Sequence, residues 1–315
     1  SHYGPASIAA LERLARRGEL PIRVYATVSS DEDTLQAEFR RGIRIGRGSD
    51  FLTVRAIKVI EDGALGSRGA ALFADYSDEP GKRGLLVTPP ERLDAIAREA
   101  REHGWQLWVH AIGDRANALA LDAFEKAAAA VPRTAPGGAR PRIEHAQVVA
   151  LSDFPRFARD GVIASIQPTH ATSDMPWAEK RVGRKRIEGA YAWRRLVQAG
   201  ARLAGGSDFP VESENPVLGF YAAVTRQDLA GNPPGGWRPE ERLTTREALA
   251  LFTTDAAYAA FEEDRRGKIA PGYDADLTVL TADPMTVPAR EIPAIRPALV
   301  IVGGRVVFDA EVPAK

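Results

Sequence analysis

Short apolar segments alternate with helical stretches along most of this chain, and that alternation restricts its fold more than any other feature. The apolar segments are rich in Val, Ile and Leu, and each is followed by a polar loop. Such a repeat is typical of βα units that build a parallel sheet. The predicted strands are residues 22–28, 54–60, 106–111, 142–147, 162–167 and 202–207.

Helices between these segments are expected to cover the sheet. The clearest begins at Thr88, where a Thr-Pro-Pro-Glu run offers an N-cap hydroxyl, and ends at Gly104. Its buried stripe is expected to contain the apolar residues at helical spacing, Leu93, Ile96, Ala97 and Ala100. Residues 114–130, with Asp114 as N-cap, and residues 184–198 are also predicted to be helical.

The strand count indicates a partial β/α barrel. A closed barrel of this type has eight strands, and six would leave bare sheet edges. We therefore expect the first strands in a segment that precedes Ser1, although an open doubly wound sheet is an alternative. Residues 276–280 and 298–308 are predicted to be strands, the second folded at Gly303 and Gly304. We expect a barrel domain over residues 1–262 and part of a small β-sandwich domain over residues 263–315.

Composition excludes several classes of protein. Lys plus Arg and Asp plus Glu both total 42, so no net field attracts nucleic acid. The absence of cysteine excludes thiolate zinc sites and cysteine nucleophiles. No apolar run approaches the ~20 residues that span a bilayer, and we expect a cytoplasmic protein without a membrane partner.

Metal-capable side chains follow several predicted strands. His110 lies near the carboxyl end of the strand in QLWVHA, His145 ends the strand in RIEHAQ, and Asp208 follows Gly205 and Gly206 in RLAGGSDFP. In a barrel, the carboxyl ends of the strands carry the active site. A lone histidine there is more often a hydrogen-bonded structural residue, and Asp208 could be only an N-cap. The recurrence at separate strands favours a shared site.

Lys58 lies in the middle of a predicted strand, VRAIKVIEDG, where an ammonium group is costly to bury unless it is paired or modified. It could be carbamylated and bind metal, form a Schiff base, or pair with a substrate carboxylate. The serine-hydrolase elbow, the phosphate-binding loop and the dinucleotide-binding turn are all absent from the sequence.

Six motifs in order resemble the amidohydrolase superfamily, in the family 3 branch to which N-substituted formamide deformylase belongs. They are IKVIEDGALGSRGAAL, WVHAIGDRAN, RIEHAQ, ASIQPTH, LAGGSDFPVE and GKIAPGYDADLTVL. The resemblance covers almost the whole chain. It implies a TIM-type (β/α)8 barrel with a β-sandwich domain, and a site for one or two divalent metal ions, with zinc expected.

The resemblance also implies roles for individual residues. The metal ligands would be Lys58 in the form of a carbamate, His110, His145 and Asp208. Asp208 would also transfer protons, and His170 would polarise or bind the substrate. Arg68 would pair with a substrate anion, although a solvated loop arginine is the alternative. The His-x-His pair of the family is absent from this sequence and is expected in the preceding segment.

Three functions remain in competition at this point. The first is metal-dependent hydrolysis of a non-peptide amide or related C–N bond in a small-molecule substrate, with a homodimer as one option for the assembly. The second is a Schiff-base lyase that uses Lys58. The third is a non-catalytic barrel that lacks a complete metal site. The sequence does not identify the substrate.

Overall fold

The computed structural model describes residues 3–46, 49–132 and 138–311 of the chain. The chain forms two compact units. The first contains residues 1–165 and 177–202, and the second contains residues 166–176 and 203–315. The predicted domain boundary at residues 262 and 263 lies inside the second unit, and it stays a prediction.

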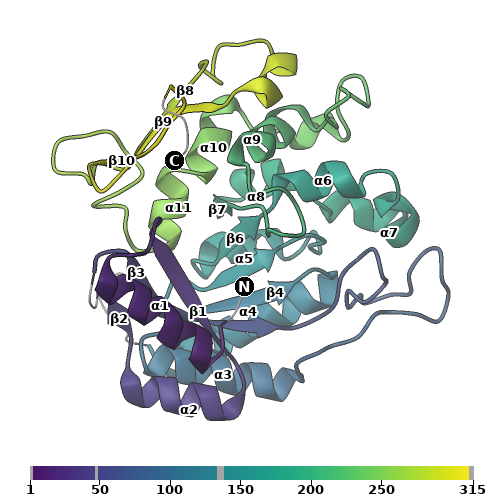
Figure 1. Cartoon of the computed structure of the whole chain (residues 1–315). Coiled ribbons are helices and arrows are strands. Elements are labelled where there is room, and N and C mark those ends of the chain that lie inside the picture. The colour runs from purple at the N-terminus through teal and green to yellow at the C-terminus, as the bar shows by residue number, and fades with distance from the viewer. Residues whose placement is uncertain (1–2, 47–48, 133–137, 312–315) are drawn as a thin grey trace. The chain divides into compact units, whose positions relative to one another are not determined.

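The first unit is built on a parallel sheet (Figure 1). Its strands pair in the order β1, β3, β4, β5, β6, and the short β2 pairs antiparallel with β3. Their bounds are β1 Val24–Ser29, β2 Arg44–Ile45, β3 Leu52–Ile60, β4 Gln106–Ala111, β5 Arg142–His145 and β6 Ile163–Ile166. All the predicted strands of this unit are therefore confirmed, while β2 was missed because a two-residue strand has no periodicity to detect.

Helices cover one face of this sheet. Helices α3 (Pro90–Glu102) and α4 (Asp114–Ala130) pack on each other and on β4, as Figure 1 shows. The other helices of the unit are α1 Pro5–Arg17, α2 Glu32–Arg41, α5 Phe154–Arg159, α7 Ala178–Arg186, η1 Ile187–Gly189 and α8 Trp193–Gln198. The stripe predicted for α3 is buried, at Leu93, Ile96, Ala97 and Ala100.

Three helix predictions need correction. Thr88 does not cap α3, because its hydroxyl donates to the Ile60 carbonyl and Pro89 is the N-cap. Asp114 is the first residue of α4 rather than its N-cap. The expected helix over residues 184–198 is broken into α7, η1 and α8, because the backbone at Ala190 is extended.

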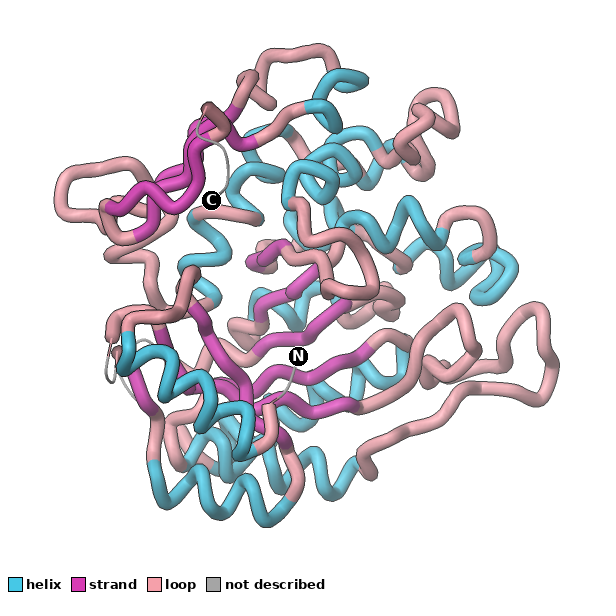
Figure 2. The backbone as a smooth tube through the Cα atoms, in the orientation of Figure 1, coloured by secondary structure: helices cyan, strands magenta, loops and turns pink. Residues whose placement is uncertain are grey.

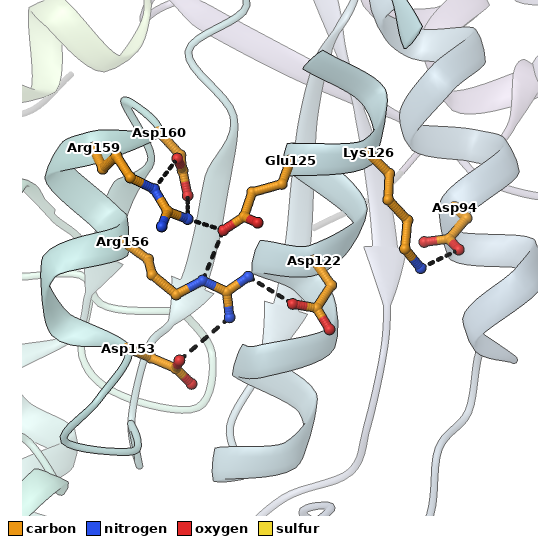
Figure 3. Close-up of polar contacts among 8 residues, drawn as sticks. All are labelled: Asp94, Asp122, Glu125, Lys126, Asp153, Arg156, Arg159 and Asp160. Atoms are coloured by element: carbon orange, nitrogen blue, oxygen red, sulfur yellow. Dashed lines mark hydrogen bonds and ion pairs between the residues drawn. The ribbon is translucent and has the colours of Figure 1, made fainter. Parts of the chain in front are cut away.

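Polar contacts join the helices on this side of the sheet. Figure 3 shows Arg156 of α5 bridging to Asp122 and Glu125 of α4 and to Asp153, with nitrogen-to-oxygen distances of 2.6, 2.8 and 3.2 Å. Lys126 of α4 pairs with Asp94 of α3 at 2.7 Å. The guanidinium group of Arg156 is therefore shared among three carboxylates, whereas Lys126 has a single partner in the figure.

A long loop joins β3 to α3. Residues 61–89 contain neither a helix nor a strand of the sheet, as the pink tube in Figure 2 shows. The loop is anchored by Arg186, which donates to the carbonyl oxygens of Ala74 and Asp75 at 2.8 and 2.6 Å. Arg181 adds a hydrogen bond to the Gly66 carbonyl at 3.2 Å. These contacts order a segment that carries much of the motif IKVIEDGALGSRGAAL.

The second unit contains mostly helices and a small antiparallel sheet of three strands, β10-β9-β8. The predicted hairpin is confirmed: β9 (Pro297–Val302) and β10 (Arg305–Asp309) pair across Gly303 and Gly304. The remaining elements are α6 Pro168–Asp174, β7 Arg202–Gly205, α9 Pro216–Thr225, η2 Pro239–Glu241, α10 Thr245–Leu251, α11 Thr254–Ala259, β8 Leu277–Leu280 and η3 Ala289–Ala294.

Gly205 at the end of β7 has a packing role. A Cβ atom at Gly205 would lie 2.8 Å from Cβ of Leu251 and 3.1 Å from the Phe252 ring. The space that the missing side chain of Gly205 leaves is filled by residues at the end of α10. Among the helices in the described part of the chain, none combines the length and apolar character that crossing a membrane requires.

Candidate functional site

One face of the parallel sheet carries polar side chains in register. Lys58 lies opposite Trp108, and Trp108 lies opposite Arg142. In the next row His110 lies opposite Glu144. Paired residues of neighbouring strands share a face, as do residues two apart on one strand, so these five side chains belong to the same face. The face that Trp108 and His110 share therefore extends over three strands.

Arg142 and Glu144 form the charged centre of this face. Arg142 Nε lies 2.8 Å from Glu144 Oε1, and the guanidinium group stacks 3.6 Å from the centre of the Trp108 ring. Ser165 donates to Glu144 Oε2 at 2.7 Å. Burial acts to raise the pKa of Glu144, but the charges of Arg142 and Lys58 and these hydrogen bonds hold it below its ordinary value. Lys58 therefore lies within electrostatic reach of a buried carboxylate.

His110 and His145 meet at the ends of neighbouring strands. Their ring centroids are 4.5 Å apart, and the ring planes are inclined by 72°. Regular alternation would place His145 on the face opposite to Glu144. His145 instead has a left-handed backbone, with φ of 79°, and Ala146 follows with φ of 42°. This conformation costs a non-glycine residue on the order of 1–3 kcal/mol, and such strain gathers at functional sites.

Two acidic residues that we did not select from the sequence follow β3 directly. Asp62 is buried, and its carboxylate oxygen Oδ1 lies 3.5 Å from His110 Nε2. Burial raises the pKa of Asp62 to about 7, against the lowering effect of hydrogen bonds from Gly113, Ile112 and Ala71. The sequence did contain a signal for these residues, because two adjacent acids follow an apolar strand. Successive side chains of a strand point to opposite faces, so at least one of the two acids must point into the protein.

Glu61 is completely buried, and among the described residues neither of its carboxylate oxygens accepts a hydrogen bond. Burial raises the pKa of Glu61 to about 8, and the nearby charge of Asp62 adds to the effect. A buried carboxyl without hydrogen bonds is therefore expected to be largely neutral at pH 7.

Asp208 and His170, the residues predicted to transfer protons and to polarise or bind the substrate, belong to the second unit. Asp208 is exposed and has a left-handed backbone, with φ of 57°. His170 lies in α6, and burial lowers the pKa of its imidazole, while the charges of Glu212 and Asp208 act in the opposite direction. Asp208 is therefore close enough to His170 for their charges to interact, as a shared role would require.

Arg68 makes contacts inside the loop after β3. Its Nε and Nη2 atoms donate to the two carboxylate oxygens of Asp78 at 3.1 and 3.0 Å, and Glu79 lies 3.0 Å from Nε. The predicted pairing of Arg68 with a substrate anion stays a prediction, and such an anion would have to compete with both carboxylates.

Comparison with known proteins agrees with the resemblance. The model of the amidohydrolase family matches residues 2–308. The chain belongs to the amidohydrolase family. The YtcJ protein of Bacillus subtilis is 34% identical over 311 residues, which cover 98% of this chain and 57% of YtcJ. N-substituted formamide deformylase of Arthrobacter pascens is 29% identical over 209 residues, or 64% of this chain and 36% of the deformylase.

The same relationship appears in three dimensions. The crystal structure of an uncharacterized metal-dependent hydrolase of Pyrococcus horikoshii has a TM-score of 0.79 and 32% identity, covering 91% of this chain and 56% of that one. The predicted fold is therefore confirmed: an amidohydrolase with the parallel sheet of a partial barrel and a small antiparallel sheet. The chain spans little more than half the length of YtcJ and of the P. horikoshii hydrolase.

Two of the predicted metal ligands, His110 and His145, lie next to each other. The imidazoles of His110 and His145 suit zinc, and their rings lie close enough to share an ion. Within residues 3–46, 49–132 and 138–311, no group of three or more His, Asp and Glu side chains is arranged to hold a metal. The two histidines therefore fit a partial donor set, to which Lys58 as a carbamate and Asp208 are the predicted additions.

A separate cavity of about 630 Å³ lies within the first unit. Lys58, His110 and His145 do not line it. Its wall combines apolar residues at 148–151 with basic residues at 184–186. It also includes Asp114, the first residue of α4, which accepts a hydrogen bond from Phe73 of the loop after β3. The cavity and the predicted ligands Lys58, His110 and His145 therefore involve different residues of the first unit.

Proposed function

We propose that this amidohydrolase hydrolyses a non-peptide amide or a related C–N bond of a small molecule with the help of bound zinc. The observation that carries the proposal is the meeting of His110 and His145 at neighbouring strand ends. Family membership and the similarity to a metal-dependent hydrolase support it. The name of the A. pascens relative, N-substituted formamide deformylase, supports the choice of bond.

The proposal gives the chain's residues distinct tasks. Zinc, when bound, would lower the pKa of a water molecule to about 7. His110 and His145 would hold the metal as neutral imidazoles. Asp208 would take a proton from the attacking water on its carboxylate and deliver it to the leaving nitrogen. His170, which burial keeps neutral, would donate a hydrogen bond to the carbonyl oxygen of the substrate.

The carbamate form and the ammonium form of Lys58 would have different roles, and an experiment can distinguish them. As a carbamate it would bind metal through oxygen, and as an ammonium group it would act on Glu144 only through its charge. Intact mass in bicarbonate buffer under native conditions distinguishes the two forms, because the carbamate adds one molecule of carbon dioxide. A Lys58→Met variant gives the reference spectrum, in which no such adduct can form at this position.

The experiment for the proposed function is a screen of N-formyl, N-acyl and cyclic amides with the zinc-loaded chain. We expect a chelator to abolish turnover and zinc to restore it. Asp208→Asn should keep the metal and lose turnover, since the amide cannot accept the proton. Full turnover in the chelated protein, or unchanged turnover in Asp208→Asn, would contradict the mechanism.

A further inference from the structure

Asp62 joins two segments that follow neighbouring strands. Its Oδ2 accepts hydrogen bonds from the backbone N–H groups of Ala71 and Gly113, both at 2.8 Å. Its Oδ1 accepts from the N–H group of Ile112 at 3.0 Å. Ala71 belongs to the loop after β3, whereas Ile112 and Gly113 form the turn after β4. One buried side chain therefore holds both segments.

The same carboxylate reaches the ring of His110. Oδ1, which binds the N–H group of Ile112, also lies 3.5 Å from His110 Nε2. The Asp62 side chain is 0% exposed and that of His110 is 17% exposed. Because little water is present to compete, the carboxylate favours the tautomer of His110 that carries its proton on Nε2 and its lone pair on Nδ1.

Close packing keeps Asp62 in this position. A Cβ atom at Gly113 would lie 1.9 Å from the carbonyl oxygen of Ala71, so the turn and the loop are in direct contact. The loop cannot move away from the turn without breaking the hydrogen bonds of Asp62, and each broken bond would leave a buried polar group unsatisfied.

We propose that Asp62 is a positioning residue, which sets the tautomer and the orientation of His110 through its carboxylate. The functional value of this orientation rests on the proposed metal-dependent hydrolysis. The contact between Asp62 and His110 does not depend on that proposal, and its effect on the tautomer can be measured in the metal-free protein.

Asp114 provides a matched control. Its buried carboxylate accepts hydrogen bonds from the N–H groups of Phe73 and Arg115 at 3.0 and 2.9 Å, so it also anchors the loop after β3. Asp62→Asn and Asp114→Asn thus each weaken an anchor of the same loop. The two variants differ in that the Asp62 carboxylate is the one close to His110.

The experiment is two-bond proton–nitrogen NMR of the metal-free chain, whose five histidines make a simple spectrum. We expect His110 to carry its proton on Nε2 in the wild type and in Asp114→Asn, and to become a mixture of tautomers in Asp62→Asn. A proton on Nδ1 in the wild type would overturn the proposal, even if Asp62→Asn fails to fold.

Zinc affinity, measured by competition with a chelating dye, is the second readout. We expect Asp62→Asn to bind zinc about 10- to 100-fold more weakly than Asp114→Asn. Equal affinities with an unchanged tautomer would overturn the role of Asp62. A shifted tautomer in a chain that binds no zinc in any form would support that role and contradict the proposed function instead.

Discussion

Glu61 shows how one buried side chain controls pH dependence at the residue scale. Its pKa rises from 4.5 to about 8 in the folded chain, mainly through burial and secondly through the charge of Asp62. The folded state therefore binds a proton more tightly than the unfolded state. The resulting contribution to stability is complete below pH 4.5 and is lost as the pH rises towards 8.

We predict that Glu61→Gln removes this part of the pH dependence. Between pH 5 and pH 8 the free energy of unfolding should fall by several kcal/mol more in the wild type than in the variant, at about 1.4 kcal/mol per pH unit. Urea unfolding at several pH values measures the difference. Glu179→Gln, at an exposed position, is the control, and parallel pH profiles of wild type and Glu61→Gln would contradict the prediction.

The left-handed backbone of His145 leads to a second prediction. Both His145→Gly and His145→Ala remove the imidazole, but only glycine adopts a φ of 79° without steric strain. The glycine variant should be more stable than the alanine variant by about 1 kcal/mol in urea unfolding. At His103, where φ is −90°, the same pair of substitutions should show no advantage for glycine. An advantage of equal size at both positions would rule out strain at His145.

At the scale of elements, the shared guanidinium group of Arg156 connects α4 and α5 (Figure 3). The Arg156 side chain is 16% exposed, whereas that of Lys126 is 62% exposed. We predict that Arg156→Met lowers the free energy of unfolding by about 1–2 kcal/mol, because three carboxylates lose a common partner. Lys126→Met should cost about 0.5 kcal/mol or less, since exposed pairs are weak. Thermal unfolding of the two variants at low and high salt tests the difference, and equal losses would contradict it.

At the scale of the whole molecule, a metal that binds only the folded chain must stabilise it. Zinc at a hundred times its dissociation constant should raise the free energy of unfolding by about 2.7 kcal/mol. The double variant His110→Ala/His145→Ala should lose this gain, while His103→Ala, at an exposed position, should keep it. Thermal unfolding with and without zinc measures the shift. A gain that survives in the double variant would place the metal elsewhere.

Sequence periodicity determined the parallel strands, the stripe of α3 and the hairpin at Gly303 and Gly304, because these features depend on neighbours along the chain. The sequence also selected His110 and His145, near the ends of their strands, and predicted a shared site for them. The contact between the two rings depends on the left-handed turn at His145, and the pair of Arg142 and Glu144 on the same face was not predicted.

Capping and buried acids were decided by tertiary contacts. The hydroxyl of Thr88 binds the carbonyl of Ile60 rather than an N–H group of α3, a choice that depends on a strand far away in the sequence. Asp62 likewise gains its partners from two loops that meet only in the folded chain. Local patterns therefore specify the elements, whereas the partners of polar side chains depend on which elements fold against each other.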